Sequence, residues 1–119
     1  MRLSRYVNGK IYVITGIDAR KCYIGTTTEL ISQRLAKHRA QYKKYKEYGG
    51  KYKPVYEIFD EFGDGTIIEL IEFYPCNSKA ELDKHKNEYI RNCECVNKHE
   101  YMKMEVRNKP VKGPAVTAS

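Results

Sequence analysis

The chain has 119 residues, of which 41% are hydrophobic and 31% charged, and this composition is typical of one globular domain rather than of a disordered protein. Its 22 basic and 15 acidic residues give a net charge of +7, which favours a polyanionic partner, nucleic acid first and a membrane surface second. The longest apolar run near the N-terminus, residues 11–14, is far shorter than the ~20 residues of a membrane-spanning helix and shorter than the apolar part of a secretory signal. We therefore expect an intracellular protein with no membrane partner, whose four cysteines are free thiols.

Charge is unevenly distributed along the chain. Residues 37–53 carry seven lysines and arginines against one glutamate, whereas residues 54–78 carry six acidic residues and no lysine or arginine. This segregation predicts one face that meets phosphate groups and another that does not. The alternative is that residues 37–53 form an ordinary lysine-rich helix whose charges are solvated.

Two short strands are predicted at the start of the chain. Residues 9–14 are rich in β-branched and aromatic side chains, and residues 22–25 follow as a second short strand. Between them, residues 15–21 contain a glycine and an aspartate and predict a hairpin loop. The threonines at 26–28 offer side-chain oxygens that could cap a following helix.

Two helices are predicted next. The apolar or large residues at positions 31, 35, 38 and 42 follow a helical period, which predicts a helix that continues to about residue 46 and ends before Gly49 and Gly50. Pro54 suits the first turn of a second helix, because its missing N–H would have no partner there. Apolar residues at positions 55, 58, 59 and 62 continue this helix, and Gly63 ends it.

A third strand is predicted at residues 66–74. Its apolar side chains alternate between the two faces, with Ile67, Ile71 and Phe73 on one face and Ile68 and Leu70 on the other. A strand that is apolar on both faces is usually covered on both, so we expect a central strand.

A third helix is predicted after this strand. Ser78 and Glu81 have the spacing of a capping box, and the helix is expected to run to about residue 92. The order of elements is therefore β-β-α-α-β-α, an α/β fold with an antiparallel hairpin and one further strand. Residues 109–119 are rich in proline, glycine, alanine, threonine and serine, and we expect them to be a disordered tail or a cloning remnant after one domain at residues 1–108.

Several short motifs occur in a fixed order along the chain. They are Gly9-Lys10-Ile11-Tyr12, Tyr23-Ile24-Gly25 ten residues later, Arg34, His38, Glu81-Leu82, Tyr89-Ile90 and Val96-Asn97-Lys98. Together they resemble the GIY-YIG nuclease superfamily over residues 9–98. The resemblance implies a three-stranded antiparallel sheet flanked by helices. It also implies an enzyme that cleaves phosphodiesters in double-stranded or branched DNA with one divalent metal, Mg²⁺ or Mn²⁺.

Tyr12 and Tyr23 lie on the two paired strands, so their side chains can face one site. By the resemblance, Tyr12 is the candidate general base or orients the attacking water, and Tyr23 positions the phosphate. A free tyrosine has a pKa of about 10, and cations such as Lys10, Arg34 and the metal would increase its ionised fraction. The alternative for either tyrosine is packing in the sheet with a satisfied hydroxyl.

Arg34 and His38 are four residues apart and share one face of the predicted helix. A guanidinium can hold a phosphate by two parallel hydrogen bonds, and His38 could bond the same phosphate or assist the leaving group. The alternative is an ordinary surface arginine and an ordinary surface histidine. Gly25 would let backbone or substrate approach closely, unless it is a plain turn glycine.

The third helix departs from the family at the metal ligand. The family places a glutamate four residues before the isoleucine that is Ile90 in this chain, and that position is Lys86 here. An ammonium group cannot ligate Mg²⁺. Three explanations remain: the chain is inactive, Glu88 takes over through a shifted helix register, or the alignment is displaced by two residues. Helical geometry points Glu88 away from the inward face. We expect the fold and DNA binding to survive in each case.

The stretch 39–56 interleaves tyrosines with lysines. It predicts a DNA-contact surface beside the active site, because lysines hold the phosphate backbone and tyrosines stack on bases or bond phosphates. The alternative is that some of these tyrosines, such as Tyr42 and Tyr56, belong to the core. The residues expected to contact DNA are Lys10, Gly25, Lys43, Lys44, Tyr45, Lys46, Lys51, Lys53 and Asn97.

The first interpretation is a metal-dependent DNA endonuclease whose activity Lys86 puts in doubt. The competing interpretations are a non-catalytic DNA-binding or regulatory module on the same scaffold and an RNA-binding protein that uses the tyrosine–lysine surface. One small domain offers little surface for specificity, so we expect a homodimer or a partner to supply it. A metal knuckle at Cys93-x-Cys95 with His99 lacks the spacing of structural zinc sites, and free buried thiols are favoured instead.

Overall fold

The computed structural model describes residues 4–17 and 21–98. Its elements, in chain order, are η1 (Arg5–Asn8), β1 (Lys10–Thr15), β2 (Cys22–Thr27), α1 (Ile31–Tyr48), α2 (Tyr56–Phe62), η2 (Gly63–Gly65), β3 (Ile67–Phe73) and α3 (Lys79–Asn92). The order of helices and strands confirms the predicted β-β-α-α-β-α arrangement. The predicted tail at residues 109–119 lies outside the described residues.

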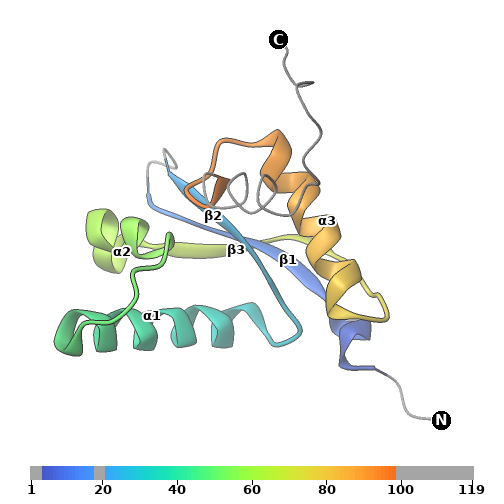
Figure 1. Ribbon diagram of the computed structural model, residues 1–119, viewed down its shortest axis with the longest axis horizontal. Helices are drawn as coiled ribbons and strands as arrows, with labels where there is room; N and C mark the ends of the chain where they lie inside the picture. Colours follow the sequence, from blue (N-terminus) through green and yellow to red (C-terminus); the bar gives the residue numbers. More distant parts are fainter. Residues whose placement is uncertain (1–3, 18–20, 99–119) are drawn as a thin grey trace, which may run out of the picture.

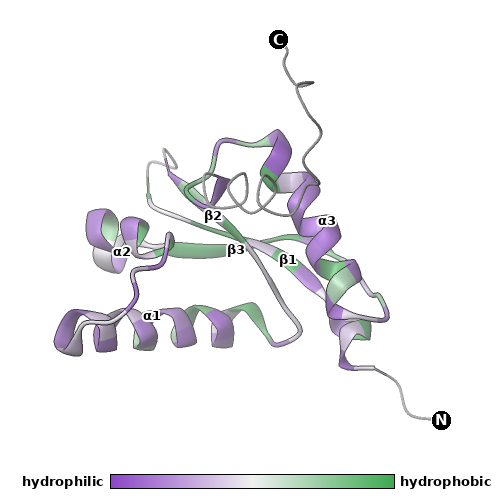
Figure 2. Cartoon of the chain, viewed as in Figure 1, coloured by the Kyte–Doolittle hydropathy of each residue, from purple (hydrophilic) through white to green (hydrophobic). Residues whose placement is uncertain are grey.

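The three strands form one antiparallel sheet in the order β2-β1-β3, which confirms the predicted α/β class. The central strand is β1, whose Ile11 and Ile14 are fully buried. The prediction that β3 is central is wrong: Leu70 and Phe73 of β3 are 49% and 53% exposed, because this strand has a neighbour on one side only. Apolar residues on both faces of β3 therefore mark an exposed edge of the sheet (Figure 2).

A β-bulge interrupts the pairing of β1 with β3. Tyr12 pairs with Leu70 and Lys10 pairs with Phe73, while Ile71 is the extra residue between the two registers. Side chains of directly paired residues point to the same face of a sheet. Phe73 therefore shares a face with Leu70 and Tyr12, and the predicted strict alternation, which put Phe73 on the opposite face from Leu70, is wrong at this position.

Helices cover both faces of the sheet (Figure 1). On one face, Tyr12 and Ile14 pack with buried residues of α2 and half-buried residues of α1. On the other face, Leu82 of α3 packs in a second cluster with Ile11 and Ile24. The candidate catalytic tyrosine therefore lies on the face that α1 and α2 cover. No helix in the described part of the chain has the length and apolarity that crossing a membrane requires.

The start of α3 is as predicted, whereas that of α1 is not. Ser78 Oγ accepts a hydrogen bond from the Glu81 N–H, and the Glu81 carboxylate accepts one from the Asn77 N–H, as in a capping box. No side chain caps α1. Thr27 Oγ1 instead accepts from the Glu29 N–H in the turn before the helix, so the threonine caps predicted from the sequence stabilise a turn.

Candidate active site

A hydrogen-bonded group joins the central strand to α1. The Tyr12 hydroxyl lies 2.7 Å from His38 Nε2, and Arg34 Nε donates to the same hydroxyl at 3.3 Å. An arginine can only donate hydrogen bonds. The Tyr12 hydroxyl donates to His38 Nε2 in the tautomer whose proton is on Nδ1, and in either tautomer the three side chains form a chain from Arg34 through Tyr12 to His38.

Burial sets the protonation of this group. Tyr12 is 1% exposed and His38 is 3% exposed. Burial raises the pKa of Tyr12, and the opposing effect of Arg34 is smaller. Arg34 thus acts in the direction expected of a nearby cation, but loss of hydration outweighs this single close guanidinium. Burial lowers the pKa of His38 to about 4, with Arg34 and then Lys53 acting in the same direction, so His38 is neutral at pH 7.

His38 is held between two tyrosine rings. The rings of Tyr12 and Tyr23 meet it edge-on, with centroids 5.9 Å and 5.7 Å away. Its Nδ1 is buried and has no hydrogen-bond partner among the residues that the structure describes, which is uncommon for a buried polar atom. The four predicted catalytic residues, Tyr12, Tyr23, Arg34 and His38, thus lie together, and their histidine keeps one ring nitrogen unused.

Gly25 makes room for the catalytic tyrosine. It pairs with Tyr12 across β1 and β2, and a Cβ at this position would lie 2.4 Å from the Tyr12 hydroxyl oxygen. The group that approaches Gly25 is the ring of Tyr12, not the backbone or substrate that was predicted. Gly25 is buried in this contact, so the structure gives it a packing role, and DNA contact by its backbone stays a prediction.

Asn97 also has a packing role. Its side-chain amide donates to the Ile24 carbonyl at 2.7 Å and accepts from the Ile24 N–H at 3.3 Å. The side chain is buried. The motif residue predicted to touch DNA thus fixes the strand that carries Tyr23, and contact with DNA stays a prediction.

Lys10 lies on the same face of β1 as Tyr12, two residues away. Its ammonium donates to the carbonyls of Asn8 and Glu29, and it lies 5.6 Å from the centre of the Phe73 ring. A cation is therefore held at the margin of the site, beside the start of α1.

In the stretch 39–56, the lysines are exposed whereas several of the tyrosines pack against one another. Five lysines lie exposed on α1 and the loop after it: Lys43, Lys44, Lys46, Lys51 and Lys53. The ring of Tyr45 packs against Tyr56 with centroids 4.9 Å apart, and Tyr42 packs against Tyr56 and Phe59. Tyr56 is 3% exposed. Tyr42, Tyr45 and Tyr56 thus form an aromatic cluster between α1 and α2, and the lysines remain as the candidate DNA-binding side chains.

Position 86 lies on the inward side of α3. Lys86 is four residues from both Leu82 and Ile90, the two buried residues of this helix. Its ammonium lies 3.9 Å from the carboxylate of Asp83. Across residues 4–17 and 21–98, no cluster of three histidine, cysteine, aspartate or glutamate side chains is placed to hold a metal ion. At position 86 the ammonium of Lys86 does not offer the oxygen ligand that the divalent metal implied by the resemblance takes.

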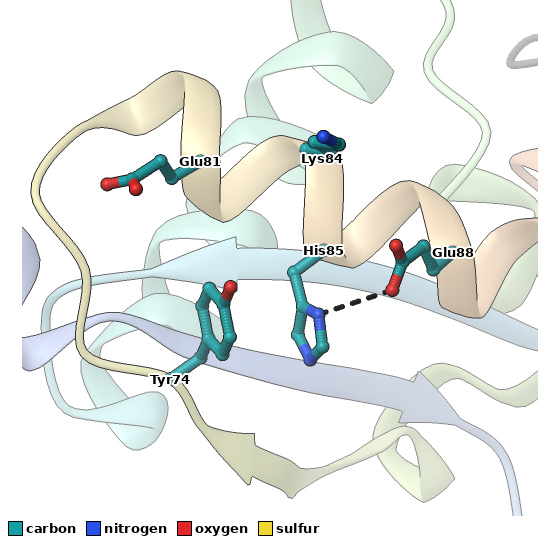
Figure 3. A pocket seen from close by; sticks show the side chains of 5 residues that line it. All are labelled: Tyr74, Glu81, Lys84, His85 and Glu88. Atoms are coloured by element: carbon teal, nitrogen blue, oxygen red, sulfur yellow. Dashed lines mark ion pairs between the residues drawn. The ribbon is translucent and has the colours of Figure 1, made fainter.

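Glu88 lies on a different side of α3. Its carboxylate is 3.5 Å from His85 Nδ1, and both residues line a shallow polar pocket with Tyr74, Glu81 and Lys84 (Figure 3). The helix α3 begins at the predicted cap, and Glu88 is exposed on it. The geometry thus gives no support to Glu88 as a replacement metal ligand.

One polar group was not predicted from the sequence. Glu72 of β3 accepts hydrogen bonds from His85 at 2.7 Å and from Tyr89 at 2.6 Å, and Tyr74 stacks on His85 with ring centroids 3.9 Å apart. The spacing of four between His85 and Tyr89 marks one helix face, but it does not indicate which strand residue meets that face. This group ties α3 to the edge strand.

The rival cysteine knuckle does not form in the described residues. The four cysteines are half-buried free thiols, as predicted. Cys22 donates to the Glu94 carbonyl, and burial raises the pKa of Cys22 and that of Cys95, the latter to about 11. His99 lies outside the described residues. Burial thus keeps Cys22 and Cys95 protonated at neutral pH.

Comparison with known proteins identifies the fold. The family model of the GIY-YIG catalytic domain matches residues 8–105, which contain every residue of the hydrogen-bonded group. No significant match occurs among curated proteins or among solved structures. The matched region covers most of the chain and follows the motif order found in the sequence. The chain therefore belongs to the GIY-YIG family, a nuclease-type domain family.

Proposed function

We propose that this chain binds a phosphodiester of DNA beside Tyr12 and is an endonuclease whose turnover is limited by Lys86. The observation that carries the proposal is the buried chain from Arg34 through Tyr12 to His38. A purely structural tyrosine needs neither a guanidinium nor a neutral imidazole as partners. The family match supports the same chemistry.

The proposed chemistry uses Tyr12 as a proton relay. As the water oxygen bonds phosphorus and the bond from phosphorus to the leaving oxygen breaks, the water gives a proton to the Tyr12 oxygen and Tyr12 passes its hydroxyl proton to Nε2 of the neutral His38. The leaving oxygen takes a proton from solvent. A base with a pKa of about 4 is weak. A bound phosphate beside Arg34 would offset the guanidinium charge that lowers the pKa of His38. Substrate binding would thus strengthen the base, and Arg34 would stabilise charge on the phosphoryl oxygens.

A divalent ion, Mg²⁺ or Mn²⁺, would normally stabilise charge on the phosphoryl oxygens and lower the pKa of an attacking water. These ions take oxygen ligands, and position 86 offers an ammonium group instead. We therefore propose that this chain binds the ion poorly. The relay and the phosphate contact do not depend on the side chain at position 86.

The exposed lysines of α1 and the following loop support double-stranded or branched DNA as the ligand. Each lysine that neutralises a phosphate makes binding more sensitive to salt. One small domain offers little surface for reading bases, so we propose that a homodimer or a partner supplies specificity.

Lys86 favours a second function, that of a non-catalytic DNA-binding or regulatory module. An ammonium at position 86 removes a metal ligand and adds attraction for phosphate. In this version Arg34 and Lys10 would hold DNA without cutting it. The two functions differ in whether a carboxylate at position 86 restores cleavage.

The test is a matched cleavage assay on supercoiled plasmid with Mg²⁺, Mn²⁺ or EDTA. It compares the unchanged chain with Lys86→Glu and with the control Lys84→Glu, which makes the same charge change at an exposed position. Metal-dependent nicking by Lys86→Glu alone supports the proposal. Binding without cleavage by all three proteins favours the non-catalytic module, and loss of all DNA binding rejects both functions.

A further inference from the structure

Two exposed apolar side chains lie next to the candidate active site. Leu70 is 49% exposed and pairs with Tyr12, and Phe73 is 53% exposed and pairs with Lys10. We call Leu70 and Phe73 the apolar strip. Both lie in β3, which is hydrophobic along much of its length (Figure 2).

The β-bulge places both residues on the catalytic face. Residues three apart in a regular strand point to opposite faces. The extra residue, Ile71, corrects this offset, so that Leu70 and Phe73 face the same side as Tyr12. Bulges often lie beside active sites, where they change the direction of a side chain. The bulge thus turns both side chains to the face of the sheet that carries Tyr12, across β1 from Gly25, over which the Tyr12 hydroxyl lies.

Charge is divided between the two faces of β3. Glu72 points to the opposite face, where it accepts from His85 and Tyr89 of α3. On the catalytic face, the Lys10 ammonium lies 5.6 Å from the Phe73 ring and Arg34 bonds Tyr12. One cation, Lys10, therefore lies beside the Phe73 end of the strip, and a second, Arg34, lies at the Tyr12 hydroxyl on the same face of the sheet. An apolar ring next to a cation suits a ligand that is flat and apolar in one part and anionic in the next.

A nucleotide has this character, since each planar base is followed by a phosphate. Inside a paired duplex the faces of the bases are covered by their neighbours, whereas an unstacked base exposes a face that an aromatic side chain can contact. We propose that the apolar strip contacts nucleobases beside the phosphodiester at Tyr12, so that the site prefers DNA whose bases are unpaired next to that phosphodiester. This inference rests on the proposed function.

A second copy of the chain is a poorer occupant of this edge. The bulge breaks the regular hydrogen-bonding pattern that an added strand needs. Residues 54–78 also carry six acidic residues and no lysine or arginine, and two copies joined at β3 would bring these segments together. Like charges across such a contact oppose association.

The test measures binding of two fluorescein-labelled probes in EDTA, a fully paired duplex and the same duplex with a central unpaired bubble. The unchanged chain should bind the bubble more tightly. Phe73→Ala should weaken bubble binding by roughly 5- to 100-fold, the range for loss of one aromatic–base contact, and leave duplex binding nearly unchanged. Leu70→Ala should have the same direction and a smaller effect.

The matched control is Ile67→Ala. Ile67 is an exposed residue of the same strand, 43% accessible, and it pairs with Thr15 on the opposite face. Its replacement should leave both affinities unchanged. Because all three side chains are exposed, thermal unfolding should show that each variant is folded.

The outcomes separate this inference from the proposed function. Equal binding of both probes by the unchanged chain, or equal effects of Phe73→Ala and Ile67→Ala, overturns the apolar strip while DNA binding stands. Failure to bind either probe overturns both. Sedimentation that shows a dimer lost on Phe73→Ala, with no change in probe preference, overturns the inference in favour of a second copy.

Discussion

His38 and His85 lie on opposite faces of the same sheet, and each contacts tyrosine rings. His38 is 3% exposed, bonds Tyr12 and leaves Nδ1 without a partner. His85 stacks on Tyr74, and each of its ring nitrogens faces a carboxylate. The same residue types thus build a satisfied structural contact on one face and, on the other, a neutral base with an unused nitrogen.

The neighbours explain this difference. His38 is close to the cationic Arg34 and Lys53 and is removed from water, and both effects favour its neutral form. On the α3 face, hydrogen bonds from Tyr89 and then from His85 lower the pKa of Glu72. Sequence motifs alone do not separate these two environments, and the following experiments test whether the separation is functional.

The largest expected effect is on cleavage. In the Lys86→Glu background, Tyr12→Phe should slow single-turnover plasmid nicking by roughly 100- to 10,000-fold, because it removes the group that relays the proton. Tyr89→Phe removes a hydroxyl from the other face and should leave the rate unchanged. Equal rates for the two variants would show that the Tyr12 hydroxyl has no role in the chemistry.

The next effect is on stability below neutral pH. The pKa of His38 is lowered from 6.5 to about 4 in the folded chain, so the unfolded state binds more protons between these values. Stability is therefore full above the unfolded pKa and falls as pH decreases through this range, by up to about 3 kcal/mol.

Urea unfolding at a series of pH values should show this loss in the unchanged chain and a flatter profile in His38→Gln. His85→Gln is the control and should keep the loss, because His85 lies on the other face. A profile of the same slope in His38→Gln and in the unchanged chain would contradict the assignment.

A smaller effect is expected at the glycine beneath Tyr12. A Cβ at Gly25 would lie 2.4 Å from the Tyr12 hydroxyl oxygen and 2.5 Å from its Cζ. Gly25→Ala should therefore lower the free energy of unfolding by about 1–3 kcal/mol, as overpacking does. At Gly65 the nearest atom would lie 3.5 Å away, so Gly65→Ala should be tolerated. Denaturant unfolding measures the stability of both variants. Equal free energies of unfolding for Gly25→Ala and Gly65→Ala would contradict the expected clash and would mean that the Tyr12 ring can move aside.

The smallest effect belongs to the α3 face. Glu72→Gln weakens exposed interactions with His85 and Tyr89, and such interactions contribute little in water. The free energy of unfolding should fall by no more than about 1 kcal/mol. Cleavage by the Lys86→Glu background should be unchanged, and a large loss of cleavage would remove the functional distinction between the two faces.

The candidate catalytic group can be predicted from the sequence because its geometry is local or regular. Arg34 and His38 share a face through helical spacing, and Tyr12 and Tyr23 follow from the hairpin. The start of α3 was also predictable, since Ser78 and Glu81 cap it through short-range bonds. Each of these features depends on residues close together in the chain.

The remaining features depend on contacts between distant residues. The strand β3 lies at the edge because it pairs with β1 alone, and its own sequence does not show with how many strands it pairs. The bulge at Ile71 is not marked by a glycine or a proline. The direction of the Tyr12 pKa follows from how completely the sheet and helices exclude water. The lysines around Tyr45 predict a place for it on the DNA surface. The sequence does not show that its ring packs against Tyr56, because Tyr56 belongs to another helix.

The contact between Asn97 and Ile24 has a consequence for the order of folding. The amide makes the two hydrogen bonds that a neighbouring strand would make to the outer edge of β2, and Val96 extends the cover by donating to the Cys22 carbonyl. Asn97 and Ile24 are 73 positions apart in the chain. During synthesis the outer edge of the first hairpin therefore stays open until almost the whole domain has left the ribosome. Until then, a chaperone or another nascent chain has access to that edge.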